Sequence, residues 1–167
     1  MRVEGQPPEM VREDFDRIAG LIEDPDAIDR WTELVIPQVP DGCDVLEVGC
    51  GIGALARRLA ARARRVLAID LSPRMVEVAR RCSAGHDNLE VREADLMAWE
   101  APGTFDAVVS IAAVHHLPFE VAVSRLAALV RPGGQLLVLD MFAARGLREL
   151  PYKVLFRFAG GRRHRRL

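Results

Sequence analysis

The sequence predicts an α/β fold: an open, doubly wound and mostly parallel sheet flanked by helices. Two observations carry this prediction. Short apolar runs alternate with segments of helical spacing, which is typical of βαβ units, and a glycine-rich loop at 49–53 follows the first run and begins a helix. With 167 residues, 50% hydrophobic and 28% charged, the chain is long and apolar enough for one folded domain and excludes a disordered chain.

Five strands are predicted along the chain. Each is a short apolar run bounded by turn-forming or charged residues. They are expected at residues 45–48, 66–69, 88–92, 105–111 and 136–141. Because parallel strands are joined by right-handed crossovers, their carboxyl ends should lie along one edge of the sheet.

The predicted helices fill the connections between these strands. Residues 54–64 and 118–130 show helical spacing, and Pro132 to Gly134 is expected as a turn that ends the second helix. Ser72 and Pro73 predict a further helix start, because serine caps a helix and proline fits its first turn. Residues before 36 are expected to form one or two helices with four apolar side chains on one face: Phe15, Ile18, Leu21 and Ile22.

The chain divides into a helical cap or lid at 1–35, a core at 36–143 and a basic helix and tail at 144–167. The net charge of −1 conceals this division: acidic residues outnumber basic ones by eight up to residue 143, and basic residues outnumber acidic ones by seven after it. A final helix is expected at 146–159. Its basic amphipathic pattern suits packing on the sheet, and the alternative is contact with an anionic membrane or nucleic acid.

The strand at 136–141 is expected to be an edge of the sheet. The sequence after it has room for one helix only. Either the chain is truncated, or this edge is exposed or covered by a partner, such as a second copy in a homodimer.

Nothing in the sequence predicts a membrane span, a secretion signal or a metal site. No apolar run approaches the roughly 20 residues that a span requires, and the first residues are polar and acidic. Three cysteines at unrelated spacings match neither a disulfide framework nor a zinc pattern. A soluble, cytoplasmic protein is expected.

Glycines and acids gather at the predicted carboxyl ends of the strands, where doubly wound sheets bind their ligands. The loop from Gly49 to Gly53 allows a ligand to approach the backbone closely. Gly49, Gly51 and Ala54 also fit the looser dinucleotide-binding pattern, and Asp70 follows about 20 residues later, as that pattern requires. The loop by itself therefore leaves an NAD-dependent oxidoreductase open.

Two acids favour a different ligand. Glu47 lies two residues before Gly49, where a carboxylate repels a pyrophosphate and suits an ammonium-bearing ligand. Asp95 follows the third strand and is placed to accept from an exocyclic amine. The competing interpretation is that Asp95 only caps the turn at 95–98.

Five stretches in order extend this pattern: VLEVGCGIG (45–53), AIDLSPRMVEVAR (68–80), EADLMAW (93–99), FDAVVSIAAVHHLP (105–118) and LVRPGGQLLVLD (129–140). Together they resemble the class I S-adenosylmethionine-dependent methyltransferases, especially the small-molecule branch that includes ubiquinone and menaquinone biosynthesis enzymes. The resemblance covers about two-thirds of the chain. It implies a Rossmann-like fold, S-adenosylmethionine as cofactor, S-adenosylhomocysteine as product and a small organic methyl acceptor. The chain departs from the family in leaving no room for the antiparallel strand pair that usually completes the sheet.

The resemblance also implies a role for each matching residue. The methionine part of the cofactor would be bordered by the glycine loop and the end of the fourth strand: Glu47, the backbone of Gly49, Gly51 and Gly53, and the carbonyl of Ile111 or Ala112, which would receive the ammonium. Cys50 fills space within the loop. Asp70 would accept from both ribose hydroxyls, and Leu71 would pack on the adenine. Asp95 would accept from the adenine amino group, with the Leu96 N–H at the ring edge.

His115 and His116 lie where the methyl acceptor is expected. A histidine can take a proton from a hydroxyl or an activated carbon, and equally the pair can shape the loop and contact the cofactor through water. Phe15, Arg17 and Trp31 are candidate lid residues, and the alternative for Phe15 and Trp31 is a place in the core. The remaining alternative is a methyltransferase-like domain that binds cofactor without turnover.

Overall fold

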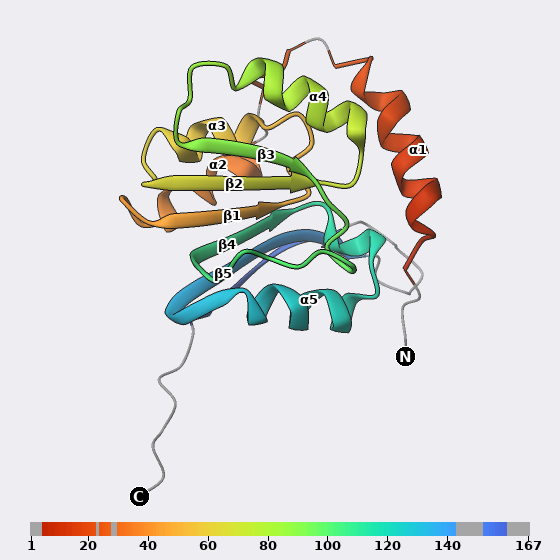
Figure 1. Ribbon diagram of the computed structural model, residues 1–167. Coiled ribbons are helices and arrows are strands. Elements are labelled where there is room, and N and C mark those ends of the chain that lie inside the picture. The colour runs from red at the N-terminus through yellow and green to blue at the C-terminus, as the bar shows by residue number, and fades with distance from the viewer. Residues whose placement is uncertain (1–4, 23, 28–29, 143–151, 160–167) are drawn as a thin grey trace, which may run out of the picture.

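The computed structural model describes residues 5–22, 24–27, 30–142 and 152–159 (Figure 1). Its six-stranded sheet has the order β3-β2-β1-β4-β5-β6, and all strands are parallel except β6, which is antiparallel to β5. This confirms the predicted fold class. The strands are β1 (Asp44–Val48), β2 (Arg65–Asp70), β3 (Leu89–Glu93), β4 (Phe105–Ile111), β5 (Val130–Phe142) and β6 (Tyr152–Ala159).

Helices cover both faces of this sheet. α3 and α4 lie on one face and α5 on the other, while α1 stands beside α4 at the end of the sheet where β1 and β2 finish (Figure 1). The helical elements are α1 (Pro8–Ala19), α2 (Arg30–Glu33), η1 (Ile36–Gln38), α3 (Ala54–Ala60), α4 (Pro73–Cys82), η2 (Val114–His116) and α5 (Phe119–Ala128).

β1 is buried on both faces because it lies in the middle of the sheet. Val45 belongs to the apolar cluster beneath α3 and α4, whereas Leu46 belongs to the cluster beneath α5. Neighbouring residues of a strand point to opposite faces, so a central strand needs apolar residues at every position. That requirement produces the continuous apolar runs from which the strands were predicted.

Side chains from outside two helices determine where those helices begin and end. Ser72 caps α4 as predicted, because its Oγ accepts a hydrogen bond from the Met75 N–H at 3.0 Å. α3 ends at Ala60, earlier than the predicted 54–64. The Asn88 side chain donates to the carbonyls of Ala60 at 2.8 Å and Ala63 at 3.1 Å, which satisfies the helix end.

β5 contains the segment that was predicted as a turn. It begins at Val130, and Pro132 to Gly134 lies within it at a bulge where the pairing with β4 shifts register. Gly133 has a φ of +86°, and a Cβ on Gly134 would lie 2.6 Å from the carbonyl oxygen of Asp106. The turn prediction was wrong because a bulge uses the same residues as a turn.

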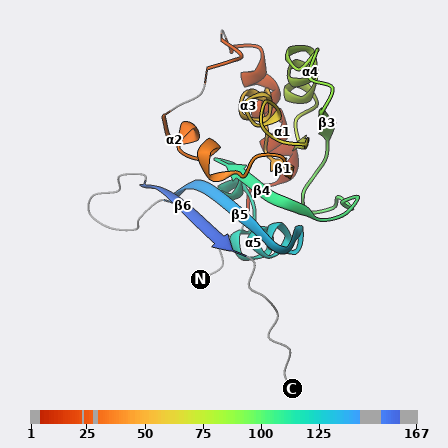
Figure 2. The same cartoon turned by 90° about the vertical axis from the view of Figure 1, so that its left-hand side faces the viewer.

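The prediction of a helix at 146–159 is wrong for residues 152–159, which form β6 along β5 (Figure 2). From Tyr152 to Phe158 the sequence alternates aromatic or β-branched residues with others, a period of two that favours a strand. Pro151 also falls within the predicted helix, whose interior it disfavours. The strand predicted at 136–141 is therefore not an edge, and a homodimer is not needed to cover it. Residues 144–151 and 160–167 of the basic segment lie outside the described residues.

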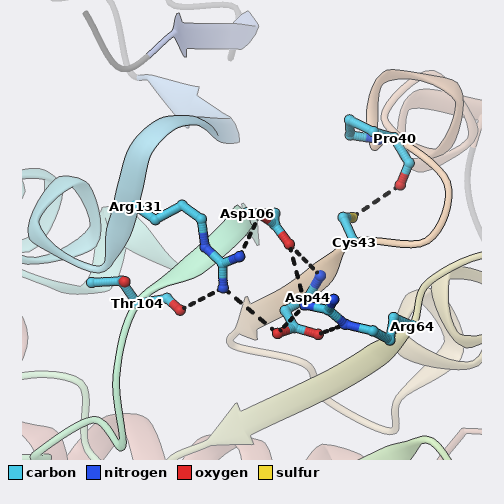
Figure 3. A network of polar contacts seen from close by, with 7 residues as sticks. All are labelled: Pro40, Cys43, Asp44, Arg64, Thr104, Asp106 and Arg131. Atoms are coloured by element: carbon cyan, nitrogen blue, oxygen red, sulfur yellow. Dashed lines mark hydrogen bonds and ion pairs between the residues drawn. The ribbon is translucent and has the colours of Figure 1, made fainter. Parts of the chain in front are cut away.

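The amino ends of four strands are joined by charged side chains (Figure 3). Arg64 donates to both carboxylate oxygens of Asp44 at 2.9 and 2.7 Å. Arg131 donates to Asp106 at 2.7 Å, and Asp106 accepts from the Asp44 backbone N–H at 2.8 Å. This network ties β1, β2, β4 and β5 together at the end of the sheet opposite the carboxyl ends.

Candidate functional site

A cavity of about 250 Å³ lies at the carboxyl ends of the parallel strands. Its wall comes from the glycine loop, the ends of β2 and β4, the segment after β3, and α1. β1 and β4 are neighbours here while their crossovers run to opposite sides, which is where doubly wound sheets bind ligands. Nine of the predicted site residues contribute to this wall: Gly49, Gly51, Asp70, Leu71, Asp95, Leu96, Ile111, Ala112 and His116. Four others lie outside it: Glu47, Cys50, Gly53 and His115.

The glycine loop needs glycine for both conformation and space. Gly49 has a φ of +76°, and a Cβ there would lie 2.4 Å from the Cβ of Ala113. Gly51 has a φ of +53°, and its backbone N–H donates to Asp70 Oδ2 at 2.7 Å. The loop therefore lies directly against the segment after β4 and is tied to the end of β2.

Asp70 lies at the centre of the site. Besides the Gly51 bond, its Oδ1 accepts from the Ser72 N–H at 2.9 Å. Burial raises the pKa of Asp70, and the backbone donors Ser72 and Gly51 oppose that rise. Each carboxylate oxygen has two lone pairs, so both retain the capacity to accept another hydrogen bond from a ligand such as a vicinal diol.

Glu47 lies behind the glycine loop rather than in the cavity wall. It is 3% exposed, and its Oε2 has no hydrogen-bond partner among the described residues. Burial, and secondarily the Asp70 carboxylate, raise the pKa of Glu47 to about 8, with Arg57 opposing them. At neutral pH this acid is therefore mostly protonated, a costly arrangement that a cationic group in the cavity would relieve.

Asp95 caps the turn that follows β3 and also borders the cavity. Its Oδ1 accepts from the Met97 N–H at 2.8 Å, and its carbonyl accepts from the N–H groups of Ala98 and Trp99, so it does cap the turn. Asp95 also borders the cavity, next to Leu96.

Ala112 has the only positive φ among the non-glycine residues that the structure describes, at 51°. Its N–H donates to the Leu139 carbonyl at 2.8 Å, which anchors the strained turn to β5. Backbone strain of this kind costs about 1–3 kcal/mol and concentrates at functional sites. Here it lies in the cavity wall immediately after β4.

The two histidines have different partners. His115 donates its backbone N–H to Asp140 Oδ2 at 3.0 Å, and its ring Nδ1 lies 2.6 Å from Asp140 Oδ1. The His116 Nδ1 lies 2.5 Å from the Gln6 Oε1, and its ring packs edge-on against Phe15. Burial, and then the neighbouring His115, lower the pKa of His116.

α1 forms the outer wall of the cavity. Val11, Arg12 and Phe15 border the cavity. Asp16 holds α1 in place: its Oδ1 accepts from the Ser72 hydroxyl at 2.5 Å and from the Arg74 N–H at 3.2 Å. Sequence reasoning missed Asp16 because nothing in its local pattern indicates a partner on another helix.

Of the other two lid candidates, Arg17 does not border the cavity. Arg17 is exposed and pairs with Asp14 on its own helix, and the Trp31 side chain lies outside the described residues. Of the apolar face predicted for the N-terminal helices, Ile18 is 45% exposed, and Leu21, which lies beyond the end of α1, is 75% exposed.

In the described part of the chain, no three His, Cys, Asp or Glu side chains are grouped as metal ligands. None of the helices there is long and apolar enough to cross a membrane.

Comparisons with known proteins agree with this geometry. A family model described as a methyltransferase domain matches residues 45–134. An uncharacterised methyltransferase of Mycobacterium tuberculosis (strain ATCC 25618 / H37Rv) is 46% identical over 114 residues, which is 65% of this chain and 56% of that protein. A ubiquinone biosynthesis O-methyltransferase of Xanthomonas campestris pv. campestris (strain B100) is 40% identical over 99 residues, 57% of this chain and 41% of that protein. The chain thus spans about half the length of the curated relatives it matches.

Solved structures share the fold. The [4+2]-cyclase SpnF superposes with a TM-score of 0.77 at 24% identity, covering 88% of this chain and 66% of that one. DhpI in complex with S-adenosylhomocysteine superposes with a TM-score of 0.65 at 25% identity, covering 87% of this chain and 78% of that one. The oxidoreductase alternative finds no support in these comparisons.

Proposed function

The chain belongs to the methyltransferase domain family, and we propose that it is an enzyme that transfers a methyl group from S-adenosylmethionine to a small organic acceptor. The observation that carries the proposal is Asp70. Its two oxygens are oriented by the Gly51 and Ser72 N–H groups at the cavity wall, and DhpI, which shares the fold at 25% identity, is solved in complex with S-adenosylhomocysteine. A carboxylate held in this way suits the two hydroxyls of a ribose.

The hydrogen bond between the Gly51 N–H and Asp70 disfavours a dinucleotide. Pyrophosphates bind to free backbone N–H groups at a helix N-terminus. Here the Gly51 N–H already donates to Asp70, and two acids, Glu47 and Asp70, lie at the loop. A negatively charged diphosphate would have to displace that hydrogen bond and approach these acids.

The other predicted contacts complete the proposal. Asp95 and Leu96 would border the adenine, as would Leu71 at the end of β2. The carbonyl of Ala112, whose φ is positive, would accept a hydrogen bond from the cofactor's ammonium. Glu47 behind the loop would stabilise the positive charge of that ammonium. Gly49 lets the segment after β4 pack against the loop beside the methionine part, because Ala113 takes the space that a Cβ on Gly49 would need.

In the mechanism, the cofactor supplies a methyl group already activated by a sulfonium. The protein has to align the acceptor, exclude water and accept a proton where the acceptor carries one. Val11 and Phe15 of α1 would exclude water from the outer side. The two histidines after β4 are the ionisable groups placed to handle the acceptor's proton.

Calorimetry of the protein with S-adenosylhomocysteine and with NAD, side by side, tests the proposal. We expect saturable binding of S-adenosylhomocysteine and no binding of NAD at the same concentrations. Turnover is tested separately by release of S-adenosylhomocysteine from S-adenosylmethionine in the presence of a mixture of small acceptors. Binding without release for every acceptor would favour the cofactor-binding domain without turnover, and preference for NAD would overturn the proposal.

A further inference from the structure

Asp140 at the end of β5 is a buried acid for which sequence reasoning proposed no role. It is 1% exposed. Each of its carboxylate oxygens contacts His115: Oδ2 accepts from the His115 backbone N–H at 3.0 Å, and Oδ1 lies 2.6 Å from the His115 ring Nδ1. The carboxylate therefore fixes both the backbone and the ring of His115.

This contact determines which ring nitrogen carries the proton. An ionised carboxylate can only accept hydrogen bonds, so the proton must be on Nδ1. Nε2 then holds the lone pair and is the basic atom of the ring. The carboxylate also stabilises the imidazolium that forms if Nε2 takes a proton.

His116 shares the Nδ1–H tautomer, because an amide oxygen also only accepts, but its partner carries no charge that would stabilise an imidazolium. Its Nδ1 faces the neutral amide oxygen of Gln6, and its ring is packed between Phe15 and His115. Burial lowers its pKa. His116 borders the cavity, and the centroids of the His115 and His116 rings are 4.0 Å apart, so His115 lies one ring away from the cavity wall. The His115 side chain is 28% exposed and so remains accessible.

We propose that the methyl acceptor carries a hydroxyl group, that His115 is the catalytic residue that takes its proton, and that Asp140 is the positioning residue that orients His115. The inference rests on the proposed function. A hydroxyl oxygen is a weak nucleophile until its proton is removed, so it needs an adjacent base. A neutral amine already presents its lone pair, and its extra proton leaves after transfer. A base held in one tautomer by a buried carboxylate is therefore most useful to a hydroxyl.

In the proposed reaction, proton transfer to His115 accompanies methyl transfer to the acceptor oxygen. The His115 Nε2 takes the hydroxyl proton while the acceptor oxygen forms its bond to the methyl carbon. The carbon–sulfur bond of the cofactor breaks, and the sulfur keeps the bonding pair, so the sulfonium becomes a neutral thioether. The positive charge passes to the His115 ring beside Asp140, and the proton leaves to water afterwards.

The first test does not depend on turnover. Nitrogen NMR of the histidine rings should find His115 as the Nδ1–H tautomer, with its signals assigned by their loss in His115→Gln. In Asp140→Asn this tautomer preference should be lost. Asp106→Asn is the matched control, because it removes a paired carboxylate at the opposite end of the sheet. It should leave the His115 signals unchanged. A tautomer change in Asp140→Asn alone would then reflect the lost contact with His115 and not a general loss of stability.

The second test compares two probe acceptors, 3,4-dihydroxybenzoate and phenethylamine. We expect the wild type to methylate the hydroxyl probe in preference to the amine. His115→Gln and Asp140→Asn should each lower kcat with that probe about 100-fold or more, as loss of a general base does. Both variants should bind S-adenosylhomocysteine within about twofold of the wild type, since neither residue borders the proposed cofactor contacts.

The outcomes separate the two proposals. Failure of the wild type to bind S-adenosylhomocysteine overturns the proposed function and this inference with it. Normal binding with preference for the amine, or with no transfer to the hydroxyl probe, overturns the hydroxyl acceptor alone. Wild-type kcat in either variant, or an Nε2–H tautomer of His115, overturns the roles of His115 and Asp140.

Discussion

Asp70 links three parts of the site through one carboxylate: the glycine loop, the start of α4 and the cavity. Replacing it by asparagine keeps the size but removes the charge and one acceptor oxygen. We expect Asp70→Asn to weaken binding of S-adenosylhomocysteine at least about tenfold, because charge-assisted hydrogen bonds contribute roughly 1.5–3 kcal/mol each. Calorimetry measures this directly, with Asp106→Asn as the control that should bind normally. Equal affinity in both variants would contradict the assignment of Asp70 to the ribose.

Glu47 makes stability depend on pH in a definite direction. Its pKa rises from an ordinary 4.5 to about 8 in the fold, so the folded state holds this proton more tightly than the unfolded state. Its contribution to the free energy of unfolding is complete below about pH 4.5 and is lost as the pH rises toward 8.

Glu47→Gln cannot lose a proton, so the variant should lack this contribution to the pH dependence. We expect the free energy of unfolding to fall between pH 5 and 8 by more in the wild type than in the variant, by on the order of a few kcal/mol. Urea titrations at several pH values give the comparison. Parallel pH profiles for the two proteins would show that Glu47 is ionised in the fold.

At the level of elements, polar contacts attach α1 to the start of α4 and to the end of β3. Asp16 accepts from the Ser72 hydroxyl and the Arg74 N–H, and Arg12 pairs with Glu93 at 3.6 Å. Asp16→Ala should increase hydrogen exchange across residues 8–19 and weaken cofactor binding, while the sheet stays protected. Asp14→Ala is the matched control, since Asp14 pairs only with the exposed Arg17 among the contacts described. Similar exchange in the two variants would show that Asp16 does not hold α1.

The bulge in β5 depends on the absence of a side chain at Gly134. A Cβ there would lie 2.6 Å from the Asp106 carbonyl and 2.9 Å from a Val130 methyl. We expect Gly134→Ala to lower the free energy of unfolding by about 1–3 kcal/mol, the usual cost of overpacking. Gly103→Ala, with no atom within 4 Å of the new Cβ, should be nearly neutral. The two are compared by thermal and urea unfolding.

Elements whose sequence pattern fits only one kind of secondary structure were predictable from the sequence. β4 was predicted with its observed bounds because both of its faces are buried, and α4 because Ser72 and Pro73 mark its start. β6 was not, because apolar residues between 147 and 158 fit helical spacing as well as the alternation that a strand requires. Its pairing with β5 is a tertiary contact that no local pattern contains.

Some residues of the site were likewise predictable from the sequence, and others were not. Gly49, Asp70 and Asp95 lie within two residues of the carboxyl end of a strand, so their positions could be inferred from the chain alone. Asp140 and Asp16 depend on partners 25 and 56 residues away in sequence. The strain at Ala112 also has no local signal, because alanine rarely adopts a positive φ.

For the whole molecule, the fold positions the cavity but does not by itself determine the chemistry. A [4+2]-cyclase shares this architecture with a TM-score of 0.77, and unrelated reactions often share one fold. The assignment of the cofactor therefore depends on the side chains that line the cavity. Acids lie at the glycine loop, whereas a dinucleotide site would need free backbone N–H donors there.

A crystal structure grown with S-adenosylhomocysteine tests this central assignment most directly. The account predicts the nucleoside in the cavity between α1 and the ends of β1 and β4, with both ribose hydroxyls within hydrogen-bond distance of the Asp70 carboxylate and the amino acid part beside the Ala112 carbonyl. A cavity that stays empty at saturating ligand, or a ribose that contacts other residues, would contradict it.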